Sequence, residues 1–315
     1  MKGPRFDTRE LARLYREGKN LSRHMREVEG SNENSTANVL YSYDLQAGSY
    51  TAFLDDPEFR VFKEEQGRRL AALLDETPGA TILDAGTGEG TTLAPILRRL
   101  STPPPGVLAF DISLSRLLYA QLNLREMVES AQVDPRLFVG ALESIPLLDN
   151  SVDVVVTCHA LEPNGGRERE ILSELVRVAR RRLILVEPAW ELGSEATRAR
   201  IQEHGYVKGI PETLDALGHP AGRHELWGWN ERPENEAALT VVELEGPTSK
   251  EAGRAHGAWP PYASPVSGAT LEDRGDAWYS VDDGYAFPVI QGIPCLLSQY
   301  AVLATRLGEF PVQGK

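Results

Sequence analysis

From residue 80 onward, short apolar runs alternate with amphipathic stretches, and this alternation is what most constrains the fold. Five apolar runs of strand length occupy residues 80–85, 107–111, 137–139, 152–157 and 183–187. Stretches with helical periodicity separate several of them, at residues 91–100, 113–130 and 167–180. Strands that alternate with helices favour a parallel sheet covered by helices on both faces. The sequence therefore predicts an α/β fold.

Two further strand-like runs, 224–229 and 238–244, follow a helix at about 191–206 and a short helix near 211–217. A loop that contains proline and asparagine joins the two runs, with no helix between them. Consecutive strands without an intervening helix favour an antiparallel hairpin. We expect this hairpin to close the sheet.

The residues before the sheet are predicted to be helical. Leucines and a methionine at spacings of three, four and seven predict an amphipathic helix over residues 8–29. Two more helical stretches are expected at 36–53 and 57–74. Tyr43 and Tyr50 are seven residues apart and would share one face of the second helix.

Composition is that of a globular protein. The chain has 315 residues, 41% hydrophobic and 25% charged, which is enough to bury a core without disulfides or metals. The two cysteines, Cys158 and Cys295, cannot form a disulfide framework and fit a reducing cytoplasm. No apolar run is long enough to span a membrane, and the N-terminus lacks the apolar core of a signal peptide. We expect a cytoplasmic protein.

Net charge bears on the substrate. The chain has 33 Lys and Arg against 46 Asp and Glu, a net charge of −13. An acidic protein is repelled by phosphate backbones unless it has a local basic stripe. The charge therefore argues against a nucleic-acid substrate and favours a small molecule.

A glycine-rich turn follows the first apolar run, in the sequence Ile82–Thr91. The run ends in Asp84, and glycines follow at 86, 88 and 90 before a helix begins near Thr91. Glycines allow positive φ and close approach of a ligand, and a helix N-terminus offers free N–H groups. The dinucleotide fingerprint G-x-G-x-x-G would require glycine where Thr91 stands, so the pattern disfavours NAD without excluding it.

Asp111 ends the next strand-like run, 111 − 90 = 21 residues beyond the last loop glycine. An acidic residue about 20 residues after such a loop accepts hydrogen bonds from a ribose diol. A lone acid after a strand is usually only a helix cap, but the glycine loop at this distance indicates a cofactor site.

Together with the segment Gly140–Pro146, these elements resemble the motifs of class I (Rossmann-like) S-adenosylmethionine-dependent methyltransferases over about residues 35–245. The resemblance implies a seven-stranded, mostly parallel sheet whose last strand is antiparallel, and S-adenosylmethionine as cofactor. The residues that it implies for cofactor binding are Tyr43, Asp84, Gly86, Thr87, Gly88, Gly90, Asp111, Ile112, Ala141, Leu142, Glu143, Cys158 and His159.

In one respect the chain departs from the family pattern. An Asp after the third strand meets the adenine amino group in the family, whereas this chain has Ala141 there. The side chain of Glu143 or the backbone N–H of Leu142 is then the expected adenine contact.

The segment after the fourth strand, residues 158–166, lies where the family has its methyl-transfer pocket. His159 is the best candidate for a general base, because an imidazole titrates near neutral pH. Its alternative role is to pack against the cofactor or cap a loop. Tyr43 is the second catalytic candidate, on a helix like the one that covers the cofactor in small-molecule methyltransferases, or simply part of a core stripe. Glu162 is expected to be a structural hydrogen-bond acceptor.

Residues 264–298 resemble the small zinc-ribbon-like domain of tRNA-methyltransferase activator proteins, through Ser264–Ser267 and Gly284–Pro294. Four cysteines bind zinc in metal-binding members, and the corresponding positions here are Ser264, Ser267, Ser280 and Asp283. Hydroxyls are poor zinc ligands, so we expect no structural metal. A substrate lid, an oligomer contact and a stabilising cap are the three roles open to this tail.

The expected organisation is a helical region and lid (1–78), a cofactor-binding domain (79–246), and a linker with a small α+β domain (247–315). The expected activity is methyl transfer to O or N of a small metabolite. An RNA or protein methyltransferase is the first alternative, with the tail used for recognition. A nucleotide-binding oxidoreductase or a non-catalytic cofactor-binding protein is the second. The sequence leaves a homodimer open.

Overall fold

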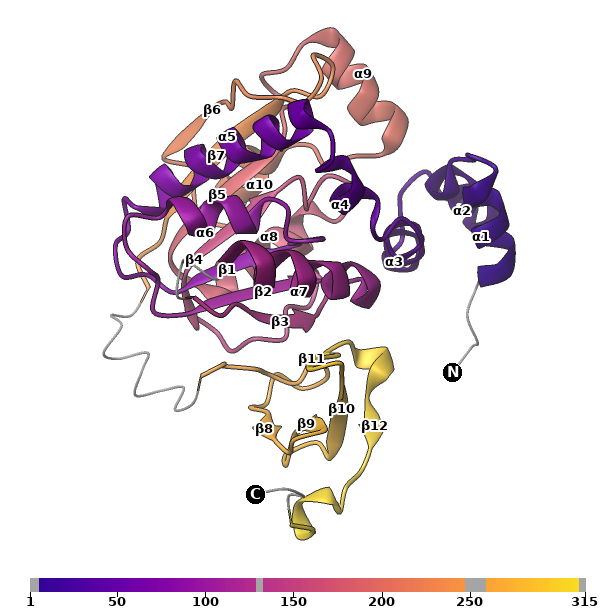
Figure 1. Cartoon of the computed structure of the whole chain (residues 1–315), viewed down its shortest axis with the longest axis vertical. Coiled ribbons are helices and arrows are strands. Elements are labelled where there is room, and N and C mark those ends of the chain that lie inside the picture. Colours follow the sequence, from indigo (N-terminus) through magenta and orange to yellow (C-terminus); the bar gives the residue numbers. More distant parts are fainter. Residues whose placement is uncertain (1–5, 129–132, 247–258, 312–315) are drawn as a thin grey trace.

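The computed structural model describes residues 6–128, 133–246 and 259–311 (Figure 1). A large sheet flanked by helices lies above a smaller antiparallel β unit at the C-terminal end. Most of the expected linker, and the end of the helix expected at 113–130, fall outside the described residues.

The described residues form a seven-stranded sheet in the order β3-β2-β1-β4-β5-β7-β6. Its strands are β1 (Ile82–Ala85), β2 (Val107–Asp111), β3 (Arg136–Val139), β4 (Val152–Cys158), β5 (Ala179–Pro188), β6 (Arg223–Leu226) and β7 (Ala237–Glu243). Strands β1 to β5 pair in parallel, whereas β7 is antiparallel to both β5 and β6. This confirms the predicted mostly parallel sheet and its closing hairpin.

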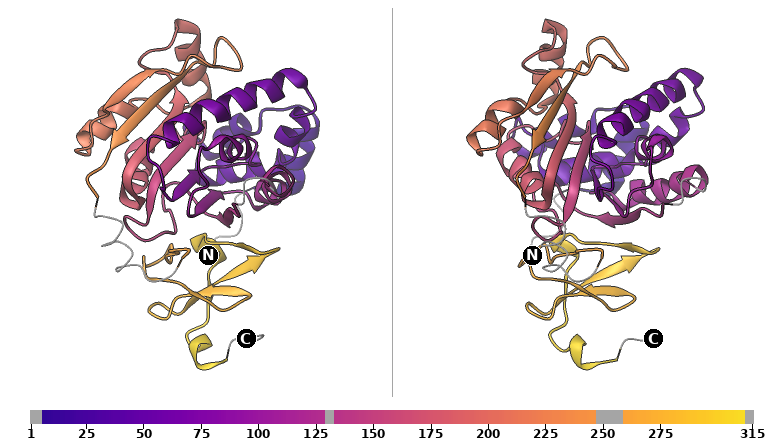
Figure 2. Two further views of the ribbon diagram at one scale, coloured as in Figure 1. Left: turned by 60° about the vertical axis from the view of Figure 1, so that its left-hand side comes forward. Right: turned by 90° about the vertical axis from the view of Figure 1, so that its left-hand side faces the viewer.

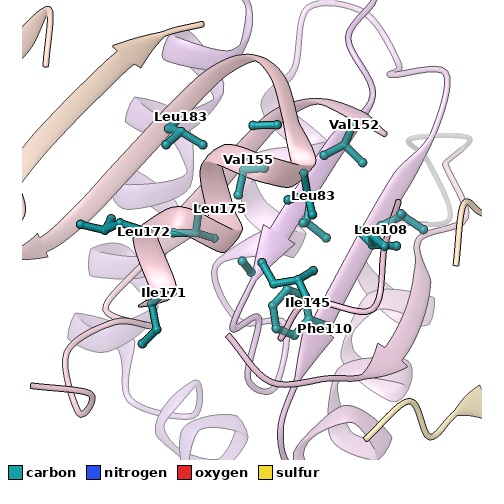
Figure 3. Packing of buried hydrophobic residues seen from close by; sticks show 14 of the residues in the cluster. Leu83, Leu108, Phe110, Ile145, Val152, Val155, Ile171, Leu172, Leu175 and Leu183 are labelled. Carbon is teal, nitrogen blue, oxygen red and sulfur yellow. The ribbon is translucent and has the colours of Figure 1, made fainter. Parts of the chain in front are cut away.

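Helices cover both faces of the sheet, and the central strands are therefore buried on both sides. These helices are α5 (Pro57–Leu74), α6 (Leu93–Arg99), α7 (Leu114–Val128), α8 (Glu168–Val178) and α10 (Ile210–Ala216), whereas α9 (Glu195–His204) lies beyond the end of the sheet (Figure 1). On one face, Leu172 and Leu175 of α8 pack against Val155 and Leu183 (Figure 3). On the other face, α5 and α6 pack against neighbouring residues of the same strands. Strands buried on both faces explain the continuous apolar runs in the sequence.

Two long helices predicted before the sheet are each broken in two. The stretch 8–29 forms α1 (Thr8–Arg16) and α2 (Leu21–Glu29), and the stretch 36–53 forms α3 (Thr36–Leu45) and α4 (Ser49–Phe53). Gly18 has φ +70° and Gly48 has φ +94°, values that end a right-handed helix. The prediction that Tyr43 and Tyr50 share the face of one continuous helix is therefore wrong.

The C-terminal unit is an antiparallel β structure, where the sequence predicted α+β. Its strands are β8 (Glu272–Asp273), β9 (Ala277–Tyr279), β10 (Tyr285–Ile290), β11 (Ile293–Pro294) and β12 (Val302–Leu303). Between 259 and 311 the only helical turns are two short 3₁₀ helices, Ser298–Tyr300 and Leu307–Glu309. The α part of that prediction is therefore wrong. Short strands joined by frequent turns occupy these residues and leave no room for an α-helix.

The four residues that the predicted resemblance places at the ligand positions, Ser264, Ser267, Ser280 and Asp283, lie close together. The hydroxyls of Ser264 and Ser267 donate to Asp283 Oδ2, at 2.7 and 2.6 Å. The backbone N–H of Asp283 donates to Ser280 Oγ at 3.3 Å. Hydrogen bonds thus join the turn that carries Ser264 and Ser267 to the turn that carries Ser280 and Asp283.

The C-terminal unit packs directly against the edge of the sheet at β3 (Figure 2). Cys295 pairs with Val139 in a parallel bridge. The ring of Tyr262 lies 5.2 Å from that of Phe138 and 4.7 Å from that of Trp278, edge-on to both. The two parts share one continuous core. None of the described helices is both long and apolar enough to cross a membrane.

Candidate functional site

A cavity of about 530 Å³, a volume that includes open solvent at its mouth, lies at the carboxyl ends of the central strands. In open parallel sheets, ligands bind at this edge, where the order of strands reverses. The strand order reverses between β1 and β4. The cavity is lined by Thr36, Val39, Tyr43, Gly86, Phe110, Asp111, Ile112, Arg116, Gly140, Leu142, Glu143, His159, Ala160, Pro163, Asn164 and Arg167.

The structure brings seven of the predicted site residues onto this cavity, namely Tyr43, Gly86, Asp111, Ile112, Leu142, Glu143 and His159. Asp84, Thr87, Gly88 and Gly90 belong to the glycine loop and its strand, behind the lining. Ala141 is buried away from the cavity, and Cys158 ends β4 outside the lining.

The glycine loop follows β1 and requires its glycines. Gly86, Gly88 and Gly90 have φ values of +80°, +58° and +72°. A Cβ on Gly86 would lie 2.4 Å from the Cβ of Ala160, closer than two carbons approach. Beneath the loop, burial raises the pKa of the Asp84 carboxyl to about 6.

Asp111 holds the loop and faces the cavity. Its Oδ2 accepts a hydrogen bond from the N–H of Gly88 and its Oδ1 one from the N–H of Ser113, both at 3.0 Å. A carboxylate has about four lone-pair sites, so each oxygen retains acceptor capacity toward the cavity.

Helices α3 and α4 form the N-terminal cover of the cavity. Glu143 joins this cover to the floor of the cavity. Its Oε1 accepts hydrogen bonds from Thr36 Oγ1 and, at 3.2 Å, from Arg167 Nη1. Arg167 also donates to Thr36 Oγ1 at 2.6 Å. The sequence analysis missed Thr36 and Arg167, because neither lies in a motif and they are 131 residues apart.

Arg116 lies across the glycine loop between two tyrosines. Its guanidinium carbon is 5.1 Å from the ring centre of Tyr43 and 4.9 Å from that of Tyr50. A Cβ on Gly88 would lie 2.7 Å from Arg116 Nη2, so the guanidinium rests against the loop. The break at Gly48 lets both tyrosines reach this cation. The sequence analysis missed Arg116, whose only signal is a cation on the helix that follows Asp111.

Glu89, in the glycine loop itself, binds the start of α4. Its carboxylate accepts hydrogen bonds from the N–H of Gly48 at 3.0 Å, and from the N–H and hydroxyl of Thr51 at 2.7 and 2.6 Å. A carboxylate at a helix N-terminus is favoured by the free N–H groups there. The cover of the cavity is thus anchored to the loop that the ligand approaches.

His159 has an unusual backbone and an acidic partner. Its φ is +56°, which is rare for a residue other than glycine and costs free energy. Its Nδ1 donates to Glu162 Oε2 at 2.9 Å, which leaves Nε2 as the basic nitrogen. Burial alone lowers the pKa of the imidazole, but the hydrogen bond and negative charge of Glu162 outweigh it, so the pKa of His159 is raised.

Glu187, at the end of β5, shapes the loop after His159. Its carboxylate accepts hydrogen bonds from the N–H groups of Ala160, Leu161 and Glu162 at 3.0, 3.1 and 3.2 Å. Burial raises the pKa of Glu187 to about 7. This residue has the structural role expected of a carboxylate that binds backbone groups.

A second, larger cavity of about 1680 Å³, including solvent at its mouth, adjoins the first. The two share Tyr43, His159 and Pro163 in their walls. The second cavity is also lined by aromatic side chains, namely Tyr15, Tyr50, Phe53, Phe59, Phe62 and Tyr206. His159 therefore lies in the wall between the two cavities.

Residues 82–182 match a protein-family model described as a methyltransferase domain. The matched residues include the glycine loop, Asp111 and His159. This confirms the predicted class of enzyme at the level of that domain.

Two curated proteins are similar in sequence. A malonyl-[acyl-carrier protein] O-methyltransferase from Pectobacterium atrosepticum is 29% identical over 142 residues, 45% of this chain and 49% of that protein. An uncharacterised 37.1 kDa protein of transposon Tn4556 from Streptomyces fradiae is 31% identical over 120 residues, 38% of this chain and 33% of that protein. The chain thus spans half or less of the length of these curated relatives.

Solved structures with a similar arrangement include magnesium protoporphyrin IX methyltransferase from Synechocystis PCC 6803 with bound SAM. It has a TM-score of 0.45 and 20% identity, and the match covers 58% of this chain and 80% of that chain. Another is a chain in the complex between the Haloferax volcanii Trm112 methyltransferase activator and a putative methyltransferase. Its TM-score is 0.49 and its identity 15%, with 67% of this chain and 99% of that chain covered.

Proposed function

We propose that this chain, whose residues 82–182 form a methyltransferase domain, transfers a methyl group from S-adenosylmethionine to an oxygen or nitrogen of a small-molecule metabolite. One observation carries the proposal: His159 lies in the wall common to the two cavities, and Gly86 of the glycine loop and Asp111 line the first of them. A methyl donor in one cavity and an acceptor in the other would meet at that residue.

The residues of the first cavity fit the cofactor. Asp111 has acceptor capacity for a ribose diol, and Ile112 and Leu142 provide apolar surfaces for an adenine ring. Gly86 lines the cavity at a position where a Cβ would collide with Ala160, so the loop can follow this path only with glycine there. S-adenosylmethionine would supply an electrophilic methyl group there, and the electron pair of the broken C–S bond would remain on sulfur.

His159 would act on the acceptor. Its Nε2 takes the proton that an acceptor hydroxyl loses, and Glu162 stabilises the imidazolium that results. Tyr43 would serve as a hydrogen-bond donor, because burial raises its pKa well above the ordinary value and keeps the phenol protonated. The rings of Tyr43 and Tyr50 would exclude water from the reacting groups.

Three further proposals concern location, domain boundaries and the C-terminal unit. We propose a cytoplasmic location, a domain division at about residues 78 and 246, and a stabilising role for the C-terminal unit. An RNA or protein methyltransferase that uses the C-terminal unit for recognition is the alternative, and the malonyl-[acyl-carrier protein] relative supports only a protein-linked acceptor. The resemblance of the tail to activator proteins lies outside the matched residues 82–182.

Calorimetric titration with S-adenosylmethionine, S-adenosylhomocysteine and NAD tests the proposal. We expect micromolar binding of both sulfur compounds and no binding of NAD. Gly86→Ala should abolish binding because its Cβ would collide with Ala160, whereas Gly218→Ala, also at positive φ but facing open space, should not. Asp111→Asn is the second variant, in case Gly86→Ala fails to fold. Binding of NAD alone would overturn the proposal.

A further inference from the structure

The cavity beyond His159 has a charge opposite to that of the whole chain. Its lining contains the cations Lys19, Arg26, Lys63, Arg200 and Arg232 but only the carboxylates Glu162 and Glu231. The chain as a whole has a net charge of −13. A cavity lined by one sign of charge concentrates ligands of the other sign. The positive lining of an otherwise acidic protein therefore points to an anionic ligand.

Two of the inner cations hydrogen-bond only neutral groups among the residues that the structure describes. Arg26 Nη1 donates to the carbonyl oxygen of His204 at 2.7 Å. Lys63 Nζ donates to Gln66 Oε1 at 3.1 Å and to Thr92 Oγ1 at 3.0 Å. Burial lowers the pKa of Lys63, and an anion bound nearby would raise it again. Neither positive charge is neutralised by a hydrogen-bonded carboxylate.

Arg200 lies close to the reacting residue. Its Nη2 is 3.9 Å from Glu162 Oε1, too far for a hydrogen bond, and that carboxylate already binds His159. The other contacts of its guanidinium are with Asn235 Oδ1 at 3.3 Å, His204 Nε2 at 3.4 Å and the ring of Tyr206, whose centre is 5.6 Å away. Arginine provides a planar fork of N–H donors that matches a carboxylate.

A row of aromatic side chains also lines this cavity. Tyr50, Phe53, Phe59 and Phe62 follow one another in a row, with centre-to-centre distances of 6.1, 5.6 and 6.3 Å. All four line the cavity, and the side chain of Phe53 is exposed. A row of rings beside a group of cations fits a molecule with a flat apolar body and an anionic end.

We infer that the methyl acceptor is a hydroxyaromatic carboxylate, whose carboxylate is bound by Arg200, whose ring lies against the aromatic row, and whose hydroxyl faces His159. This inference rests on the proposed function and names its substrate class. In the transfer, the hydroxyl proton passes to His159 Nε2, the oxygen forms the new bond to the methyl carbon, and the C–S electron pair stays on sulfur. The products are the methyl ether and S-adenosylhomocysteine.

The test uses the full chain saturated with S-adenosylhomocysteine. 4-Hydroxycinnamate and a panel of other hydroxyaromatic acids are each titrated beside the corresponding neutral amide, at low and at high salt. We expect the acids to bind at least about tenfold more tightly than the amides, the effect of one charged hydrogen bond. The preference should shrink at high salt because salt screens the charge.

Arg200→Gln should remove this preference while leaving the affinity for S-adenosylhomocysteine unchanged, and Arg200→Lys should restore part of it. Arg198→Gln is the matched control: it removes the same charge from the same helix, α9, but lies outside the cavity, so the preference should persist. Amides that bind as well as acids, or an unchanged preference in Arg200→Gln, would overturn the inference.

The remaining outcomes separate the inference from the proposed function. If no acid binds while S-adenosylhomocysteine binds normally, the substrate class is wrong and the proposed function stands. Binding of aryl phosphates in place of carboxylates would overturn the carboxylate assignment. If neither S-adenosylmethionine nor S-adenosylhomocysteine binds, the proposed function itself fails.

Discussion

His159 is the residue at which local strain and charge coincide. Its positive φ costs free energy that the surrounding structure must supply, and such residues cluster at functional sites. The N–H of His159 donates to the carbonyl oxygen of Val186 at 2.9 Å, which continues the pairing of β4 with β5 to the very end of the strand. Glu162 then fixes the ring from three residues further along. The imidazole is therefore held in one orientation and made more basic.

Replacing Glu162 tests this pairing through pH. The raised pKa of His159 means that the neutral, basic form is lost as the pH falls through a value above that of an ordinary histidine. Glu162→Gln removes the negative charge, so the pKa of His159 should fall. NMR titration of the imidazole measures this directly, and the acidic limb of the kcat profile should move to lower pH in parallel.

Glu170→Gln is the control for that variant, because Glu170 is an exposed carboxylate on α8. It should leave the titration of His159 unchanged. An equal pKa for His159 in the parent and in Glu162→Gln would contradict the proposed role of Glu162.

At the scale of elements, the cover of the site is tied to the glycine loop. Helix α4 begins at a glycine whose φ of +94° breaks the predicted helix, and Glu89 accepts hydrogen bonds from its first turn. The break directs Tyr43 and Tyr50 toward Arg116 from two short helices instead of one. Order in the cover is thus coupled to order in the loop.

Glu89→Ala should loosen this connection. The amide hydrogens of Gly48 and Thr51 lose a charged acceptor worth about 1.5–3 kcal/mol, and should exchange about tenfold faster or more. Affinity for S-adenosylmethionine should fall, since binding would have to order the cover as well. Hydrogen-exchange mass spectrometry of the peptide over 41–53 and calorimetry measure the two effects.

Glu64→Ala provides the comparison, because Glu64 forms ion pairs with Arg98 and Arg99 and takes no part in the hydrogen bonds between Glu89 and α4. Amide hydrogen exchange over residues 41–53 in Glu64→Ala should match that of the parent protein. Unchanged exchange in Glu89→Ala would show that the contact does not order the cover.

At the scale of the whole molecule, the C-terminal unit and the sheet stabilise each other. Tyr262, Leu271, Phe287 and Leu296 belong to the same buried cluster as Phe110 and Phe138 of the sheet. The backbone contributes as well, because the N–H of Leu296 donates to the carbonyl oxygen of Val139 at 2.9 Å. In Figures 1 and 2 the unit lies along the β3 edge of the sheet. Without the unit, that edge strand would be uncovered.

Phe287→Ala should therefore destabilise the whole chain. The side chain is fully buried, and its removal should cost about 3–5 kcal/mol. Urea unfolding followed by circular dichroism and by tryptophan fluorescence should give one coincident transition at lower urea concentration. Leu303→Ala, exposed in the same unit, should change the free energy of unfolding by less than about 0.5 kcal/mol. A separate early transition of the C-terminal unit would contradict this coupling.

The sequence by itself determined the sheet, the glycine loop and the place of Asp111. The periodicity of apolar residues and the backbone demands of glycine are local properties, and they are therefore visible in a short window of sequence. The positions of the strands and of most helices over residues 57–243 follow from such patterns.

Only the tertiary structure decided which side chains complete the site. Glu89 binds Gly48 and Thr51 across about 40 residues of sequence, and Arg200 of α9 approaches Glu162 in the loop after β4. The shared core of Phe138 and Tyr262 likewise joins residues far apart in the chain. Contacts of this kind depend on how the elements pack, and ordinary charged or aromatic residues leave no local pattern that reveals them.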